Sequence, residues 1–216
     1  MIVRVQILAL ICLLFSSCRD QSPSNYIVQG IITSSLDNMP CEGFNVEFEQ
    51  QVIEGGSFNG YFETAATTTT DAEGFYRMEF PRKSAVYFRL RVENDGWFPI
   101  LEDINPEDIE PNVAFDFDVI TTPRADLVIR VKNSPPTTDE DKLRMRLLKN
   151  LDLSTCDTEW RVFNGANIDS TWNCIVHGNV WMPYLSIDQT DPEIEITSLD
   201  SVFCTAFETT EINLFY

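Results

Sequence analysis

Residues 71–80 read DAEGFYRMEF, and this stretch decides the predicted fold. Asp71 can accept hydrogen bonds from backbone N–H groups two or three residues later, and Gly74 can adopt a positive φ at little steric cost. The residues after them alternate between apolar and polar, which places the apolar ones on one face of a β-strand. The apolar residues are Tyr76, Met78 and Phe80. The stretch therefore predicts a tight turn that leads into a strand with one buried face.

Short runs of the same kind lie on both sides of this stretch. They are rich in aromatic and β-branched residues and are separated by turn residues such as Gly, Pro, Asn and Asp. Their ranges are 26–33, 44–49, 61–70, 87–92 and 113–119. Because helical spacing is scarce in this part of the chain, the pattern predicts an all-β fold built as an antiparallel β-sandwich.

A domain boundary is predicted at residues 121–123, Thr-Thr-Pro, because a fresh strand pattern begins at residues 125–131. The first domain then spans residues 25–122. The remainder, residues 123–216, is close to the roughly 100 residues of an immunoglobulin-like sandwich. Further β-like runs in it lie at residues 173–186, 193–197 and 201–216. The second domain is therefore predicted to be another β-sandwich, of no recognised family.

The segment 139–153 fits two patterns. Leu143, Met145 and Leu147 alternate as in a strand, whereas Leu143, Leu147 and Leu151 have the spacing of one helix face. The strand is favoured because the neighbouring segments are β-like.

Three segments of the first domain together resemble one known family. Residues 30–33 read GIIT, residues 38–46 read NMPCEGFNV, and residues 69–76 read TTDAEGFY. They are similar to the Gly-containing strand, the Pro-x-x-Gly-hydrophobic-x-Val segment and the Thr-Asp-x-x-Gly-x-Tyr turn of carboxypeptidase-regulatory-like, or transthyretin-like, domains. The resemblance covers about residues 25–121. It implies a transthyretin-like sandwich that serves as a structural or docking module, often beside a membrane, and it implies no peptidase activity.

The N-terminus has the layout of a secretory signal peptide. Arg4 supplies an early positive charge, residues 7–15 are apolar, and Ser16 and Ser17 are small. The apolar run is well below the roughly 20 residues that span a bilayer as a helix. Residues 1–17 are therefore predicted to be a cleaved leader.

The residues that end this leader, Phe15-Ser16-Ser17-Cys18, resemble a bacterial lipobox. The resemblance implies that Cys18 becomes the acylated N-terminus, with palmitate-type chains, and that residues 18–24 form a short tether. More than one acyl chain suffices for stable membrane anchoring. The expected location is the cell envelope, with the outer membrane favoured and its periplasmic or surface face left open.

Composition excludes several classes of function. The chain has 15 Lys and Arg against 34 Asp and Glu, a formal net charge of −19, so nucleic acid is not an expected partner. A single histidine excludes zinc sites that need two or more His ligands. Residues 71–74 lack the spaced acidic ligands of a calcium loop, so the turn is favoured over an ion site there. No metal and no cofactor are predicted.

Two of the six cysteines, Cys12 and Cys18, belong to the leader and the lipobox. The other four are Cys41, Cys156, Cys174 and Cys204, and they allow three complete pairings. An oxidising envelope favours disulfides, and the pair Cys156 and Cys174 is favoured because these residues are nearest in sequence. The alternative is that the cysteines are buried and free.

No catalytic residues are predicted. His177 lacks a G-x-S-x-G nucleophile partner in the sequence and is interpreted as a strand-end residue. The acids Asp188, Asp191 and Glu193 are interpreted as a solvated turn in preference to a calcium site. Tryptophans in a protein of two sandwiches more often fill cores, but exposed aromatic faces can stack on sugars. Trp181 and Tyr184 are the candidates for such ligand binding.

These observations lead to one expected function and two alternatives. The expected protein is a lipid-anchored, non-enzymatic envelope lipoprotein that acts as a scaffold or binds an envelope partner. The first alternative is a glycan-binding surface lipoprotein that uses exposed aromatic residues. The second alternative is an enzyme.

Overall fold

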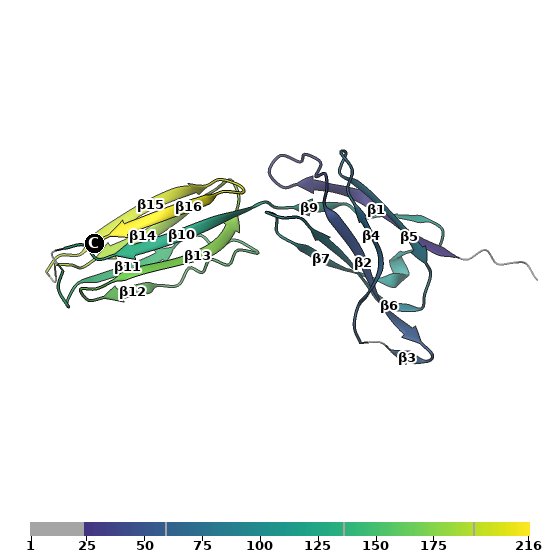
Figure 1. Ribbon diagram of the computed structural model, residues 1–216, viewed down its shortest axis with the longest axis horizontal. Coiled ribbons are helices and arrows are strands. Elements are labelled where there is room, and N and C mark those ends of the chain that lie inside the picture. The colour runs from purple at the N-terminus through teal and green to yellow at the C-terminus, as the bar shows by residue number, and fades with distance from the viewer. Residues whose placement is uncertain (1–23, 59, 136, 192) are drawn as a thin grey trace, which may run out of the picture.

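The computed structural model describes residues 24–58, 60–135, 137–191 and 193–216. The predicted leader and Cys18 lie outside these ranges, as does the predicted tether apart from Ser24. The described residues are almost entirely β, which confirms the predicted all-β fold class. Two β-sandwiches follow each other along the chain (Figure 1).

Among the described residues, the N-terminal sandwich has nine strands and one short 3₁₀ helix. Its elements are β1 (Asn25–Ser34), β2 (Asn45–Glu54), β3 (Ser57–Phe58), β4 (Glu63–Thr69), β5 (Phe75–Pro81), β6 (Ala85–Glu93), β7 (Ile100–Ile104), η1 (Pro106–Asp108), β8 (Ala114–Asp116) and β9 (Val119–Thr121). One sheet has the order β5-β1-β8, with β9 also paired to β1. The other has the order β3-β2-β6-β7, with β4 also paired to β2.

The C-terminal sandwich contains the remaining seven strands. They are β10 (Arg124–Lys132), β11 (Lys142–Leu147), β12 (Arg161–Asn164), β13 (Asp169–His177), β14 (Val180–Asp188), β15 (Ile196–Cys204) and β16 (Thr209–Phe215). One sheet has the order β13-β10-β16 and the other β12-β11-β14-β15. The predicted domain boundary falls between β9 and β10, and it stays a prediction.

Each sandwich has its own hydrophobic cluster. The N-terminal cluster is built from residues between Tyr26 and Val119, and the C-terminal cluster from residues between Ala125 and Tyr216. At the centre of the first, the ring of Phe48 is fully buried and lies 5.0 Å from that of Phe80 and 5.1 Å from that of Phe88.

Several local predictions agree with the structure. Asp71 and Gly74 form the expected turn, in which Asp71 Oδ1 accepts a hydrogen bond from the Phe75 N–H at 2.8 Å and Gly74 has φ +71°. The segment 139–153, which fits both a strand and a helix pattern, contains strand β11. Its side chains at Leu143, Met145 and Leu147 are buried. The strand was thus the right choice over the helix.

Other local predictions need correction. The sandwiches are not wholly antiparallel, because β1 pairs in parallel with β8 and β9, and β10 pairs in parallel with β16. The run 173–186 is two strands joined by a hairpin at residues 178–179, where Asn179 has a positive φ. The run 193–197 is mostly loop, because β15 begins only at Ile196. Strands β3, β7 and β12 were not predicted, since they are short or largely exposed.

Gly30 shows why the first strand needs a glycine. A Cβ at this position would lie 2.0 Å from the backbone oxygen of Phe117, so only glycine allows β1 and the β8–β9 segment to approach this closely. The same oxygen accepts a hydrogen bond from the Tyr76 hydroxyl at 2.6 Å. This close contact lies between β8 and β9 and divides the predicted strand 113–119 into two.

Tyr76→Phe removes that hydrogen bond, and we expect the free energy of unfolding at neutral pH to fall by about 1 kcal/mol. Burial raises the pKa of Tyr76 well above its ordinary value. The buried phenol therefore stabilises the fold below the unfolded pKa of about 10, and this contribution decreases as pH rises beyond it. Urea unfolding at neutral and alkaline pH measures both effects. A deficit of the variant that does not shrink at alkaline pH would contradict this assignment.

Candidate binding surface

Strand β14 places the two predicted ligand-binding residues on opposite faces. The Trp181 side chain points outward and is 59% exposed, whereas Tyr184 is only 8% exposed. The Tyr184 hydroxyl donates a hydrogen bond to Asp200 Oδ2 at 3.3 Å, and burial raises the pKa of the phenol. Residues three apart on a strand face opposite sides because the side-chain period is two. The structure therefore does not bring Trp181 and Tyr184 together on one face, and ligand binding by either residue stays a prediction.

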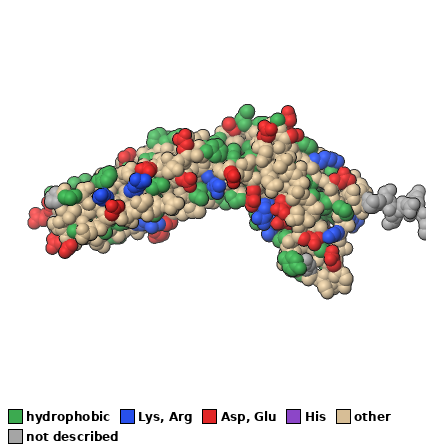
Figure 2. Space-filling model, in the orientation of Figure 1, with side chains coloured by type: hydrophobic (Ala, Val, Ile, Leu, Met, Phe, Trp, Pro, Cys, Tyr) green, Lys and Arg blue, Asp and Glu red, His purple; other side chains and the backbone are tan. Residues whose placement is uncertain are grey.

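The structure gives Trp181 different neighbours, which come from β15. The pairing register sets Trp181 opposite Phe203 and Leu185 opposite Leu199. The rings of Trp181 and Phe203 lie 5.4 Å apart, and Leu199 is 71% exposed. We call these four residues the β14–β15 patch. Figure 2 shows hydrophobic side chains at the surface along the side of the molecule where Figure 1 places β15.

A row of cations lies beside the β14–β15 patch. Lys142, Arg144 and Arg146 occupy alternate positions of β11, on the face opposite its buried residues. Arg144 forms an ion pair with Glu195 at 3.1 Å, and the Arg146 guanidinium stacks 4.9 Å from the ring centre of Trp160. Within the described ranges no carboxylate forms an ion pair with Arg146. Positive charge on this face contrasts with the strongly negative chain.

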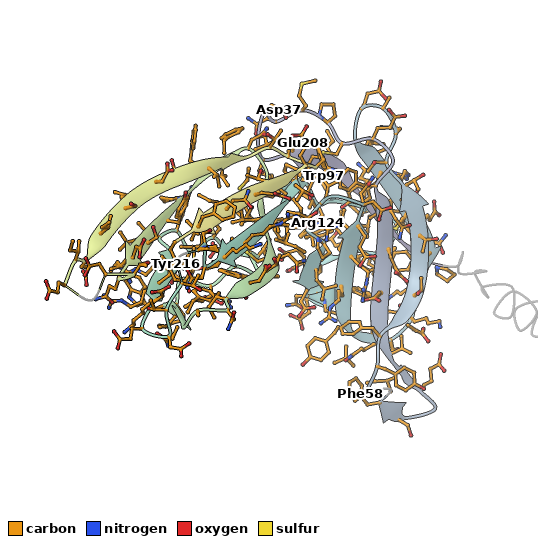
Figure 3. All side chains as sticks on the ribbon, turned by 60° about the vertical axis from the view of Figure 1, so that its left-hand side comes forward. Asp37, Phe58, Trp97, Arg124, Glu208 and Tyr216 are labelled. Atoms are coloured by element: carbon orange, nitrogen blue, oxygen red, sulfur yellow. A yellow bond between two sulfur atoms is a disulfide. The ribbon has the colours of Figure 1, made fainter. Side chains whose placement is uncertain are left out.

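The other tryptophans have structural contacts. Trp172 stacks on Phe163 at 5.9 Å. Trp97 lies 5.2 Å from Phe44 and 5.4 Å from Phe207, so it joins the two sandwiches. Trp97 and Arg124 lie together at this junction (Figure 3). The Arg124 N–H also donates to the Gly96 backbone oxygen at 2.7 Å.

His177 belongs to the same junction. Its ring packs 5.3 Å from that of Phe98, and its Nε2 atom is hydrogen-bonded to the Asp152 backbone oxygen. The backbone N–H of the next residue, Gly178, donates to the Pro123 oxygen at 2.8 Å. These contacts give the histidine a role in fixing the end of β13 against the N-terminal sandwich.

The acidic loop before β15 is stabilised by its own hydrogen bonds. Asp188 Oδ1 accepts from the Thr190 N–H at 2.8 Å, and Asp191 Oδ1 accepts from the Glu193 N–H at 2.9 Å. Across the described ranges, no three His, Cys, Asp or Glu side chains are grouped so that they could hold a metal ion. The loop therefore forms a pair of side-chain-capped turns.

The cysteines divide into a pair and two free thiols. Cys156 and Cys174 form a disulfide, which is the pairing that the sequence favoured. Cys41 and Cys204 are free and buried, and burial raises the pKa of both thiols. In the described ranges no helix is both long and apolar enough to span a membrane.

Comparison with known proteins identifies no family. No protein-family model and no curated protein matches the chain, so the transthyretin-like resemblance stays a prediction. Solved structures of other proteins are similar in part. Catechol 1,2-dioxygenase from Acinetobacter sp. ADP1 is 16% identical over 50% of this chain and 55% of its own, with a TM-score of 0.35.

Two other structures match over more of this chain. The Bacillus anthracis TIE protein is 6% identical over 89% of this chain and 33% of its own, with a TM-score of 0.38. A streptococcal ancillary pilin is 13% identical over 91% of this chain and 63% of its own, with a TM-score of 0.36. In each case the match covers less than two thirds of the other protein's chain.

Proposed function

We propose that this protein is a lipid-anchored envelope lipoprotein that binds a protein partner without catalysing a reaction. The observation that carries the proposal is the β14–β15 patch, where Trp181, Leu199 and Phe203 are all exposed on one sheet face. Grouped exposed apolar side chains of this kind are typical of interaction surfaces. Isolated exposed apolar residues would not support this interpretation.

The arrangement of the chain suits an anchored binding protein. Strand β1 begins at Asn25, at the end of the N-terminal sandwich that lies away from the C-terminal sandwich (Figure 1). An anchor at Cys18 would hold that end near the membrane and would present the β14–β15 patch away from it. The function proposed for the N-terminal sandwich is that of a spacer or scaffold.

Replacing the proposed lipidation site tests the anchoring. We expect Cys18→Ala to release the protein from membranes and to block maturation, because the acyl chains supply the membrane affinity. Fractionation of cells that express the full chain measures this. Cys12→Ala changes a cysteine inside the leader and serves as the matched control, with membrane association expected to persist. Unchanged membrane association of Cys18→Ala would refute the anchoring.

Glycan binding is the second candidate, and the exposure of Trp181 beside Phe203 favours it. Aromatic faces stack on the apolar faces of sugar rings at little cost in conformational entropy. We expect Trp181→Ala to abolish any signal on a glycan array, whereas Tyr184→Phe should retain it because that ring points inward. The absence of wild-type binding across the array would rule out this candidate.

A further inference from the structure

Strand β15 is an edge strand whose second side is open. It pairs with β14 along its whole length, from Ile196 to Cys204, and no other described strand pairs with it. An open edge presents unpaired backbone N–H and C=O groups, which can pair with another strand. At nine residues, β15 is long for an unprotected edge.

The other edges of the C-terminal sandwich are short, covered or less apolar. Strand β12 has only four residues. The edge of β13 is covered by the loop of the disulfide, in which the Thr155 N–H and the Ser154 hydroxyl both bind the Ile175 oxygen at 2.9 Å. Strand β16 carries Glu211 and is two residues shorter than β15. Strand β15 is therefore the longest edge strand of the C-terminal sandwich that is both uncovered and largely apolar.

The open side of β15 can be assigned to particular residues. The Phe203 oxygen accepts a hydrogen bond from the Thr210 hydroxyl at 3.2 Å, so it points away from β14, whereas the Cys204 oxygen accepts from the Asn179 N–H on the β14 side. Backbone groups alternate in direction along an antiparallel strand. The N–H and C=O groups of Thr197, Leu199 and Ser201 therefore face the open edge.

The side chains of β15 do little to block pairing. Edge strands are commonly protected by Lys, Pro or several charges. Strand β15 has no Lys, Arg or Pro, and Asp200 is its one charged residue. The Asp200 carboxylate accepts a hydrogen bond from the Ser201 N–H at 2.7 Å, which an incoming strand could replace with a backbone oxygen.

We propose that β15 pairs antiparallel with β15 of a second copy of this chain, around a two-fold axis at Leu199. Two identical edge strands that pair antiparallel are related by a two-fold axis perpendicular to the sheet. The side chains of directly opposed residues lie on the same face of that sheet. The axis must therefore pass through a residue that faces its own counterpart. Leu199 suits this position because its backbone groups face the open edge and its side chain is 71% exposed.

The identity of the side chains selects this register. With the axis at Leu199, Ser198 faces the partner's Asp200, Thr197 faces the partner's Ser201, and Ile196 faces the partner's Val202. Each pair matches polar with polar or apolar with apolar. An axis at Asp200 would oppose two carboxylates, and an axis at Ser198 or Ser201 would oppose Asp200 to Ile196 or Val202. Directly opposed like charges destabilise a strand pair.

The inference rests on the proposed function, because it names the partner of the β14–β15 patch. Pairing would extend the four-stranded sheet across both copies and would bring the two patches together on one face. The two copies also repel each other, since each has a formal charge of −19. Salt screens that repulsion, so pairing is expected to strengthen as the salt concentration rises.

Thiol cross-linking of the detergent-solubilised full chain tests the proposal, because the two-fold axis reverses the second copy and places the two anchored N-termini at opposite ends of the dimer (Figure 1). Opposed residues of a hydrogen-bonded strand pair have Cα atoms about 5.5 Å apart, within reach of a short bifunctional thiol reagent. We expect Leu199→Cys to give a cross-linked dimer, more of it at higher salt. Leu101→Cys is the matched control, an exposed leucine on edge strand β7 of the other sandwich, and it should give only background. The free thiols Cys41 and Cys204 are buried.

Leu199→Lys provides a second measurement on the detergent-solubilised protein. It places two ammonium groups opposite each other, and sedimentation should show dimerisation weakened about tenfold or more, with Leu101→Lys unchanged. Equal cross-linking at Leu199 and Leu101 would overturn the proposal, as would an adduct between Leu199→Cys and a different protein. A dimer in a protein whose Cys18→Ala variant keeps its membrane association would leave self-pairing intact and refute only the anchoring.

Discussion

Phe48→Ala is expected to lower the free energy of unfolding of the N-terminal sandwich by about 3–5 kcal/mol, the range for a buried phenylalanine truncated to alanine. Phe48 is fully buried, and its ring contacts Phe80 and Phe88 in the centre of the cluster. These neighbours come from both sheets, β5 and β6, so a cavity here removes packing between the layers. Denaturant unfolding, followed by near-ultraviolet circular dichroism, measures the change.

The matched control for this prediction is Phe58→Ala. Phe58 belongs to the two-residue strand β3, is 53% exposed, and lies at the tip of the sandwich (Figure 3). Its truncation should change stability by no more than about 0.5 kcal/mol. If both variants lost the same stability, Phe48 would not be part of the packed centre.

Removal of the disulfide has the second large effect. The double variant Cys156→Ala with Cys174→Ala is expected to lose about 3 kcal/mol, the typical contribution of a disulfide that closes a loop of this length. The residues are 18 apart in sequence, and their bond holds the loop at Ser154 and Thr155 against the edge of β13. Thermal unfolding with and without a reducing agent measures the contribution.

Reduction provides the internal control for the disulfide. A reducing agent should lower the melting temperature of the wild type and leave that of the double variant unchanged. The remaining free thiols, Cys41 and Cys204, are present in both proteins, so they cannot produce the difference. A wild type that is insensitive to complete reduction would show that the disulfide does not stabilise the fold.

The sequence predicts strands well where one face is buried and poorly where neither is. Strands β5 and β11 have clean alternation of buried and exposed residues, and both were identified. Strand β7 is exposed over most of its length, so its sequence has no alternation to detect. The break between β8 and β9 depends on the contact of Phe117 with Gly30, which comes from a distant strand.

The sequence predicts the candidate surface only in part, because the contacts of that surface also depend on a second strand. The spacing of Trp181 and Tyr184 already implied opposite faces on one strand, because the side-chain period is two. The partners of Trp181 depend on the register between β14 and β15, which brings Phe203 next to it. That register depends on the hairpin between residues 188 and 196, whose length and turns are not set by any simple pattern.

By itself the sequence determined the all-β class, the turn at Asp71, and the favoured pairing of Cys156 with Cys174, because each follows from local periodicity, turn chemistry or proximity along the chain. The tertiary structure decided which aromatic residues face solvent and which strand is left at an edge. Those properties depend on contacts between segments far apart in the sequence. Phe203 lies exposed beside Trp181, and Leu199 lies exposed opposite Leu185, because β15 pairs with β14 at the edge of its sheet.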